Sequence, residues 1–182
     1  MRLLLTGGAG YIGSHTCVEL MQRGHEVVIL DDFSTSGPQV LDRIAAIVGR
    51  RPSLERGSVC DPIFLERVFA RTKYDAVFHF AGKKSVMESV QDPLRYYTSN
   101  VLGTVMVLEA MRKSKVKTFV FSSSATVYGS PKTVPADETQ LVQPANPYGQ
   151  TKATVEQILE ALFTSDSEWR IACLRYFNPV GA

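Results

Sequence analysis

The chain has 182 residues, enough for one domain with a sizeable core, and its apolar (45%) and charged (21%) fractions are typical of a soluble globular protein. Its formal net charge of +2 is too small to indicate nucleic acid or an anionic membrane as a partner, and no apolar stretch is long enough for a signal peptide or a membrane span. The three cysteines fit neither a zinc-ligand spacing nor a disulfide framework, so we expect a cytoplasmic protein without a metal site, with reduced, mostly buried thiols at Cys17, Cys60 and Cys173.

Short β-rich runs alternate along the chain with longer amphipathic stretches, which is typical of βαβ units. In chain order we predict strand 3–6, helix 12–23, strand 26–30, helix 40–48, strand 53–57, helix 62–70, strand 76–80, helix 93–113, strand 118–122, helix 147–163 and strand 170–176. Several strands are almost wholly apolar, as expected for strands covered on both faces. Asp61-Pro62 and Asn146-Pro147 are cap-then-proline helix starts. The polar, proline-containing stretch 130–144 is predicted to be a surface loop.

These elements predict an α/β fold with three layers, a doubly wound parallel sheet (Rossmann fold) with strand order 3-2-1-4-5-6 and right-handed crossovers. We assign the whole of 1–182 to one nucleotide-binding domain. The chain stops just after a strand, whereas ligands of such folds bind beyond the carboxyl ends of the strands. We therefore expect it to be the first part of a longer protein, with a C-terminal substrate domain absent from this chain.

A glycine-rich turn follows the first predicted strand and opens the first predicted helix, with the sequence Gly7-Gly8-Ala9-Gly10-Tyr11-Ile12-Gly13. Glycines at this spacing allow a tight turn, close approach of a pyrophosphate to the backbone, and packing of the helix against the strand. The helix N-terminus then offers unpaired N–H groups and a positive dipole end. The turn therefore predicts a dinucleotide-binding site.

Acidic residues at the end of the second predicted strand bear on the choice of cofactor. Asp31 lies roughly 20 residues beyond the glycines, where a carboxylate can accept hydrogen bonds from ribose hydroxyls and repel a 2′-phosphate. Asp32 adds a second negative charge, and no arginine follows along the chain until Arg43. This pattern favours NAD over NADP, although a solvated acidic loop would look the same.

Tyr148 and Lys152 lie four residues apart, on one face of a predicted helix. A tyrosine with a pKa near 10 is a poor base at neutral pH, but a neighbouring ammonium and a positive nicotinamide ring favour the phenolate. The pair could then remove a proton from an alcohol while hydride leaves the carbon. Alone the spacing is weak, since a surface pair would give it too. The fifth predicted strand ends in three serines, 122–124, and one of their hydroxyls could share a hydrogen bond with the reacting oxygen and the Tyr148 hydroxyl, while at least two of them would serve only as a polar cap.

The end of the fourth predicted strand, Phe80-Ala81-Gly82, has small residues over which a cofactor could lie. Lys83 and Lys84 follow. One of them could contact a phosphate of the cofactor or of the substrate; the alternative is that both lysines are solvated. Together with the preceding segments, these residues resemble the extended short-chain dehydrogenase/reductase family over the whole chain. The resemblance also rests on the segments Ser122 to Gly129, Pro147-Tyr148-Gly149 with Lys152, and Arg175-Tyr176-Phe177-Asn178-Pro179.

Within that family the chain is similar to members that epimerise a nucleotide sugar at C4, such as UDP-glucose and UDP-galactose, through a transient 4-keto intermediate. The resemblance implies NAD as cofactor, a UDP-sugar as substrate, and catalysis by Ser124, Tyr148 and Lys152. It implies cofactor contacts by Gly7, Gly10, Tyr11, Ile12, Gly13, Asp31, Asp32, Phe33, Ser34, Thr35, Ser36, Ser58, Val59, Phe80, Ala81, Gly82, Lys84, Ser99, Ser122, Tyr148, Lys152 and Phe177. It implies substrate contacts by Lys84, Ser124, Tyr148 and Asn178.

Two positions depart from the family pattern, because Ser58 replaces a usual aspartate and Ser99 a common asparagine. A nucleotide-sugar 4,6-dehydratase is disfavoured, since Ala125 and Thr126 stand where elimination needs an acid pair. A sugar decarboxylase, another epimerase and an NAD-binding fragment without turnover stay open. The family also implies a homodimer in which helices 93–113 and 147–163 pair across a two-fold axis, using apolar residues such as Val101, Leu108, Ile158 and Leu162.

Overall fold

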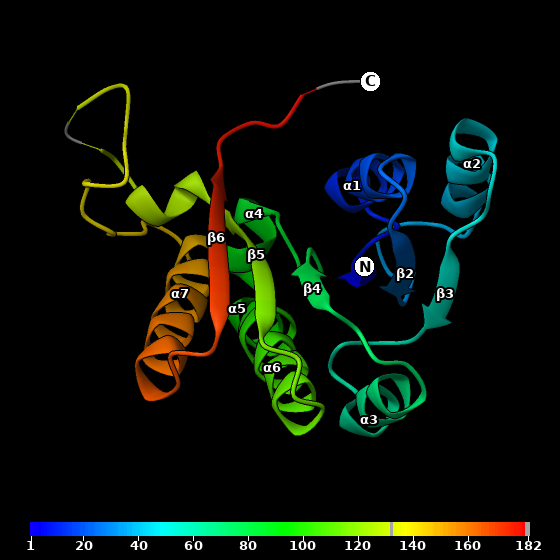
Figure 1. The fold of residues 1–182 in the computed structure, drawn as a ribbon. Helices are drawn as coiled ribbons and strands as arrows, with labels where there is room; N and C mark the ends of the chain where they lie inside the picture. Colours follow the sequence, from blue (N-terminus) through cyan, green and yellow to red (C-terminus); the bar gives the residue numbers. More distant parts are fainter. Residues whose placement is uncertain (132, 181–182) are drawn as a thin grey trace.

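The structure is a computed structural model that describes residues 1–131 and 133–180. Six parallel strands form one sheet in the order β3-β2-β1-β4-β5-β6, which confirms the predicted fold class and strand order (Figure 1). The strands are β1 (Arg2–Thr6), β2 (Glu26–Asp31), β3 (Ser53–Arg56), β4 (Ala76–His79), β5 (Thr118–Ser124) and β6 (Arg170–Tyr176). Each lies within two residues of its predicted bounds.

Two layers of helices cover the sheet. One layer holds α1 (Tyr11–Gln22) and α2 (Gln39–Val48), and the other holds α3 (Pro62–Arg71), α6 (Gly103–Lys113) and α7 (Pro147–Ser165) (Figure 1). Successive strand residues point to opposite faces, so Leu3 and Leu5 pack with the α1–α2 layer while Leu4 packs with the α3–α6–α7 layer. The buried core is thus divided between the two faces of one sheet.

The two predicted cap-then-proline starts are confirmed. The Asp61 side chain accepts a hydrogen bond from the Phe64 amide at the start of α3, at 3.0 Å. The Asn146 side chain accepts one from the Gly149 amide at the start of α7, at 2.8 Å. In both helices the following proline occupies the first turn, where its missing N–H costs nothing. These caps fix where α7, the helix with the predicted catalytic pair, begins.

The predicted helix 93–113 is a composite of α5 (Pro93–Tyr96), a π-helical segment η1 (Tyr97–Leu102) and α6. Gly103 follows the π segment, and a Cβ there would come within 3.0 Å of Val59 Cγ2, so the glycine permits close packing on Val59. Two short elements were missing from the prediction: α4 (Val86–Gln91), capped by Ser85, and a 3₁₀ segment η2 (Ala125–Tyr128). They are too short to show a hydrophobic period in the sequence.

Strand β6 lies at one edge of the sheet, and four of its seven residues are exposed. Leu174 is 40% exposed, and a groove of about 900 Å³ runs between β6 and α7. The expectation of mostly buried thiols holds for Cys17 alone, because Cys60 is half-buried and Cys173, in β6, is exposed. All three cysteines are free thiols.

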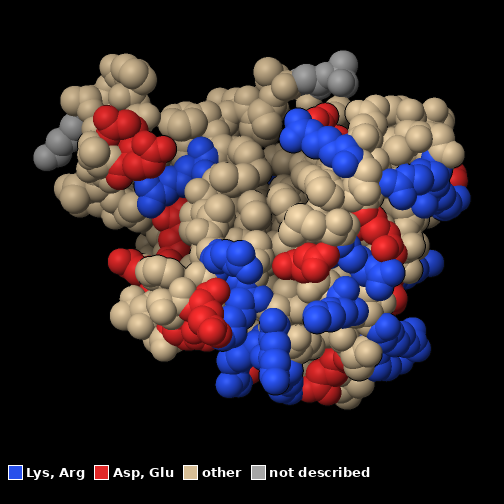
Figure 2. Space-filling model, in the orientation of Figure 1, with Lys and Arg blue, Asp and Glu red and all other residues tan. Residues whose placement is uncertain are grey.

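The loop 130–144 is exposed over most of its described residues, as predicted, with Lys132 outside the described residues. None of the helices in the described ranges is long and apolar enough to cross a membrane. Basic and acidic side chains intermingle over the face shown in Figure 2. Ion pairs on the surface of the domain include Lys113 with Glu66, Arg112 with Glu109 and Lys117 with Asp166.

Candidate active site

The predicted site residues gather at one edge of the sheet, because the carboxyl ends of all six parallel strands meet there. The glycine turn follows β1, and Asp31 ends β2. Ser58 lies just beyond β3, the segment 80–82 follows β4, and Ser124 ends β5. The ends of β1 and β4 are adjacent, since the Phe80 amide donates to the Thr6 carbonyl at 2.8 Å. In doubly wound sheets this edge is where ligands bind.

The backbone of the glycine turn is packed so closely that a side chain at Gly7 or Gly13 would clash with neighbouring backbone atoms. Gly7 has a φ of +67°, and a Cβ on it would lie 2.5 Å from the Ala81 amide nitrogen. A Cβ on Gly13 would lie 2.5 Å from the Gly7 carbonyl oxygen. Gly10 is the N-cap of α1 and has no side chain to cap the helix, so the positive dipole end of this twelve-residue helix is not covered by a capping side chain. These features fit a pyrophosphate at the helix N-terminus.

Asp31 binds the turn to the end of β2. Its side chain is 8% exposed and accepts hydrogen bonds from the amides of Ala9 (3.0 Å) and Phe33 (2.9 Å) and from the Ser36 hydroxyl (2.9 Å). A carboxylate has about four acceptor positions, so one remains for a ribose hydroxyl. Asp31 is therefore a structural part of the turn as well as a candidate ribose ligand.

An arginine lies closer to this acidic edge than the order of residues along the chain suggested. Arg56 ends β3 and pairs in register with Asp31 of β2. Its guanidinium lies over the Phe33 ring, 5.6 Å from the ring centroid. Sheet pairing, which brings together residues 25 positions apart, is not visible in the linear sequence, where Arg43 is the first arginine after Asp32. The charge at this edge is consequently less negative than the sequence analysis assumed.

Lys152 is buried in the first half of α7, and its ammonium donates a hydrogen bond to the Ser122 carbonyl at 2.7 Å. The ammonium also lies over the rings of Phe121 (4.8 Å) and Tyr148 (6.0 Å). Burial lowers the pKa of Lys152 to about 8, and the negative charge of Glu156 opposes that fall. A charged ammonium at neutral pH is therefore kept close to the Tyr148 ring.

Tyr148 and Ser124 meet in the structure as predicted. Burial raises the pKa of Tyr148, and a hydrogen bond from the Ser124 side chain works in the opposite direction. The Ser124 oxygen also accepts hydrogen bonds from the Thr126 amide (3.2 Å) and hydroxyl (2.9 Å). Ser124 is 8% exposed and Tyr148 half-buried, so the hydroxyls are partly shielded from water.

One turn after Lys152, Glu156 is held by a cluster that the sequence analysis missed. Arg175 of β6 donates to both Glu156 carboxylate oxygens (2.6 Å from Nη2 to Oε2) and to the Tyr128 hydroxyl (2.9 Å). The Arg175 guanidinium also lies 5.0 Å from the Tyr128 ring centroid. Because Glu156 is fixed by a bidentate ion pair, its negative charge stays at a constant distance from Lys152.

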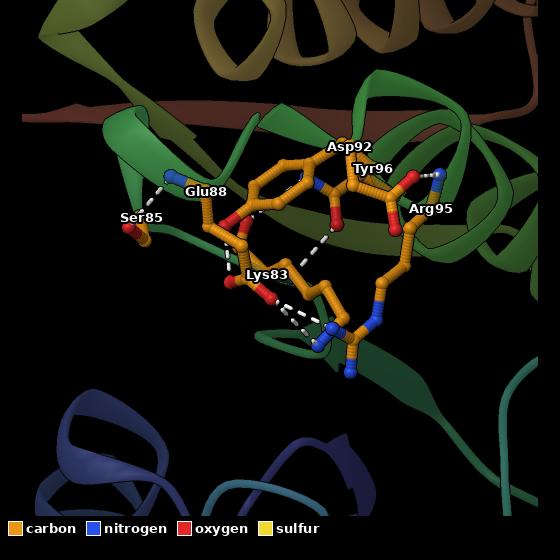
Figure 3. A network of polar contacts seen from close by, with 7 residues as sticks. Lys83, Ser85, Glu88, Asp92, Arg95 and Tyr96 are labelled. Carbon is orange, nitrogen blue, oxygen red and sulfur yellow. Dashed lines mark hydrogen bonds and ion pairs between the residues drawn. The ribbon is translucent and has the colours of Figure 1, made fainter. Parts of the chain in front are cut away.

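The short helices α4 and α5, which follow β4, carry a polar cluster around Glu88 (Figure 3). The Glu88 carboxylate accepts hydrogen bonds from Tyr96 (2.9 Å) and Arg95 (2.8 Å), and Lys83 Nζ lies 3.9 Å from it. Tyr96 is fully buried, and its ring meets that of Tyr148 edge to face at 6.4 Å. Lys83 thus forms an ion pair with Glu88, whereas Lys84 is exposed.

Asn100, in the π segment, is a second residue that the sequence analysis missed. Its side chain is buried and bonds both backbone groups of Lys83, accepting from the amide (2.8 Å) and donating to the carbonyl (3.0 Å). It also donates to the Thr151 hydroxyl at 3.1 Å. Ser99, which resemblance to the family selected, is half-buried beside it. An asparagine within an apolar helical stretch was the signal that could have identified it.

The remaining predicted residues lie along the same edge with fewer contacts. The Ser58 hydroxyl accepts a hydrogen bond from the Cys60 amide at 3.2 Å, and Val59 is buried. Tyr11 is 46% exposed and packs edge to face on His15, while Asp32, Ser34 and Thr35 are exposed. Phe177, 62% exposed, and Asn178 lie beyond β6. Their assigned contacts stay predictions.

The sequence matches the NAD dependent epimerase/dehydratase family over residues 3–182. It is 52% identical to UDP-glucose 4-epimerase of Bacillus subtilis, covering 100% of this chain and 54% of that protein. It is 49% identical to UDP-glucose 4-epimerase 2 of Arabidopsis thaliana, covering 99% of this chain and 52% of that protein.

Solved structures give the same result for the fold. UDP-glucose 4-epimerase from Bifidobacterium longum, in complex with NAD⁺ and UDP, superposes with a TM-score of 0.98 at 45% identity, covering 100% of this chain and 55% of that one. The enzyme from Stenotrophomonas maltophila, with bound NAD and formylated UDP-arabinopyranose, gives a TM-score of 0.97 at 47% identity, covering 100% of this chain and 54% of that one. The chain spans about half the length of these relatives.

Proposed function

Because the chain belongs to the NAD dependent epimerase/dehydratase family, we propose that the protein containing it interconverts UDP-glucose and UDP-galactose by inverting C4 of the sugar. The observation that carries the proposal is the contact of Ser124, Tyr148 and Lys152 at the same sheet edge as the glycine turn. Relatives about 50% identical over this whole segment carry the name UDP-glucose 4-epimerase.

The glycine turn would hold the pyrophosphate of NAD at the N-terminus of α1, and the Asp31 carboxylate would accept from the adenosine ribose. When bound, NAD accepts hydride from C4 of the sugar and returns it. Gly7 and Gly82 have no side chain, so they leave the backbone bare where a flat ring would lie. Both also have left-handed φ values, which favour glycine at these positions. The other cofactor contacts implied by the family stay part of this proposal.

Tyr148 would remove the proton of the sugar 4-hydroxyl as hydride leaves C4, and return it after the 4-keto sugar has turned over. The Ser124 hydroxyl would donate to the same sugar oxygen and share its hydrogen bond with Tyr148. The positive charge of Lys152, 6.0 Å from the Tyr148 ring centroid, favours the phenolate. Lys84, exposed beside the edge, and Asn178 would contact the UDP-sugar.

A dehydratase in the same family is disfavoured by the residues that precede Val127. Elimination of water needs an acid and a base next to the sugar, and Ala125 and Thr126 occupy that segment of η2. The Thr126 hydroxyl is bonded to Ser124. The geometry therefore provides for proton exchange at one oxygen and not for elimination.

We further propose that residues 1–182 form the NAD-binding domain and that a substrate domain packs against the exposed β6 edge in the complete protein. Support comes from the groove beside β6 and from relatives of nearly twice this length. We propose a homodimer through the apolar groove of about 310 Å³ between α6 and α7, where Ile158 and Leu162 are half-buried. Leu108, which the sequence analysis also named for this interface, is only 6% exposed and therefore offers little apolar surface to a partner. Free thiols suit a cytoplasmic location.

The proposal is tested with the complete protein, preloaded with NAD and supplied with UDP-galactose and no reductant. UDP-glucose is then measured in quenched samples by a separate dehydrogenase assay. The expected result is conversion with no net oxidation or reduction of NAD in the epimerase reaction itself. Absence of conversion, with NAD shown to be bound, would overturn the substrate assignment. Release of water from the sugar would instead indicate a dehydratase.

A further inference from the structure

A chain of buried hydrogen bonds crosses the domain behind the proposed site. Thr6 bonds His79 Nδ1 at 2.6 Å, and His79 Nε2 bonds Thr104 at 2.9 Å. The Thr104 hydroxyl donates to the Asn100 carbonyl at 2.6 Å. The Asn100 side chain donates to Thr151 at 3.1 Å, and the Thr151 hydroxyl donates to the Tyr148 carbonyl at 2.7 Å. The chain begins next to the glycine turn and ends at Tyr148.

The donors and acceptors in this chain leave His79 one consistent tautomer. The single proton of the Thr104 hydroxyl is given to the Asn100 carbonyl, so the Thr104 oxygen accepts from His79 Nε2–H. His79 Nδ1 must then be the acceptor for the Thr6 hydroxyl. Every bond from Thr6 to Thr151 consequently points the same way. Reversing any one of them would leave a buried group without its partner.

The position of His79 keeps this arrangement fixed. The ring is 1% exposed and lies beside the rings of Phe119 and Phe121. Burial, together with a smaller contribution from the positive charge of Lys152, lowers its pKa to about 3. The imidazole is therefore neutral at any working pH and cannot switch to donating from both nitrogens.

From this geometry we propose that His79 is a positioning residue for the reaction: through Thr104 and Asn100 it ties β1, beside the phosphate turn, to the backbone of Tyr148 at the start of α7. The bonds span β1, β4, α6, the π segment and α7, whose separate movement would change the distance between the bound cofactor and the Tyr148 hydroxyl. A misplacement of about 1 Å can reduce a rate on the order of 100-fold. The catalytic consequence rests on the proposed function.

The main test uses Thr104→Val in the complete protein, because valine keeps the shape of threonine and removes the hydroxyl. Thr104→Ser keeps the hydroxyl and serves as the matched control. Val107→Ala, a fully buried change on the same helix, controls for loss of stability alone. His79→Phe, which keeps an aromatic ring between Phe119 and Phe121 and removes both nitrogens, replaces Thr104→Val if that variant does not fold.

We expect Thr104→Val to lower kcat by about 10- to 100-fold with little change in KM, and Thr104→Ser to stay near wild type. Titration of Tyr148, measured as tyrosinate absorbance relative to the matching Tyr148→Phe protein, should move to higher pH in Thr104→Val as the ring leaves Ser124 and Lys152. Val107→Ala should melt earlier with kcat per folded enzyme and the Tyr148 titration unchanged.

If Thr104→Val melts earlier but keeps both kcat and the Tyr148 titration, the hydrogen-bond chain has a structural role only and the inference fails. Equal losses of kcat in Thr104→Val and Val107→Ala would also overturn it. Should wild-type protein fail to epimerise UDP-galactose, the proposed function is wrong, and the Tyr148 titration still decides whether His79 positions that residue.

Discussion

Lys152 donates a hydrogen bond to the Ser122 carbonyl at 2.7 Å, and so joins the first turns of α7 to the end of β5. Ser124, two residues further along β5, lies close enough to Tyr148 of α7 for its side chain to favour the phenolate and so lower the pKa of Tyr148. The three predicted catalytic side chains are therefore held by two elements that are tied to each other. The charge of Lys152 is kept near the Tyr148 ring without a direct hydrogen bond to the Tyr148 hydroxyl.

Replacing Lys152 by methionine should make the ligand-free protein more stable while reducing its activity. In the folded chain the pKa of Lys152 is about 8 against an ordinary 10.5, which corresponds to a cost on the order of 3 kcal/mol for the buried charge. Between these pH values the folded state binds fewer protons than the unfolded state, so wild-type stability rises with pH. The increase in the free energy of unfolding caused by Lys152→Met should be at its full value below pH 8 and should shrink as the pH rises above 8. Thermal melts at pH 7 and pH 9.5 measure this, and an equal gain at both would contradict it.

Tyr148→Phe removes the ionisable hydroxyl and keeps the ring that packs on Tyr96. Because general acid–base catalysis contributes on the order of 10²–10⁴-fold, epimerisation should fall at least that far. NAD affinity should survive, since the glycine turn and Asp31 are untouched. Coupled assays and calorimetry measure the two quantities. Near-normal turnover would show that another group exchanges the proton.

NAD should bind more tightly than NADP, because Asp31 and Asp32 repel a 2′-phosphate. Arg56, which pairs in register with Asp31, reduces that repulsion. Arg56→Gln should therefore increase the ratio of NAD affinity to NADP affinity. Arg43→Gln, a change of the same charge in α2, is the matched control. Calorimetric titration with both cofactors checks this, and equal or tighter binding of NADP to wild type would refute it.

Gly7→Ala should destabilise the fold and abolish NAD binding. The φ of +67° costs an alanine on the order of 1–3 kcal/mol, and its Cβ would come within 2.5 Å of the Ala81 amide. Gly24→Ala is the informative control, because it has a comparable φ of +83° and nothing within 4 Å of the added Cβ. Strain alone should affect both variants in a melt. Only Gly7→Ala should lose NAD, and retention of NAD by Gly7→Ala would contradict the close packing.

The complete protein should sediment as a dimer at micromolar concentration. Ile158→Glu places a charge in the apolar groove between α6 and α7 and should shift the protein towards monomer. Thr164→Glu adds the same charge at an exposed position of α7 that lines neither this groove nor the groove beside β6, and should leave the dimer intact. A wild-type monomer, or equal dissociation in both variants, would count against this interface.

The sheet order and most element bounds followed from the sequence, because buried parallel strands such as β2 are continuously apolar and helix starts such as Asp61-Pro62 carry their own caps. The composite helix did not, since α5, η1 and α6 share one amphipathic stretch. The π segment ends where Gly103 packs closely on Val59, and this contact between distant parts of the chain cannot be recognised in the linear sequence.

The candidate site was predictable where chemistry follows from a local pattern, as in the glycine turn and the Tyr148–Lys152 spacing. Residues that act through distant partners were not. Thr6 and His79 are 73 residues apart, and Asn100 and Thr151 are 51 apart, so no window of sequence contains both members of either pair. Arg56 beside Phe33 was missed for the same reason, since it depends on strand pairing.

The contact of Gly7 with Ala81 also sets the order in which the protein can mature during synthesis. The glycine turn is among the first segments to leave the ribosome, but β1 pairs with β4, and the turn packs against Ala81, which is made much later. A nascent chain that ends before β4 therefore has the phosphate-binding sequence without the surface that shapes it. The early β1–β2–β3 portion therefore lacks the finished cofactor turn, and the newly made strands must stay protected from aggregation until β4, β5 and β6 complete the sheet.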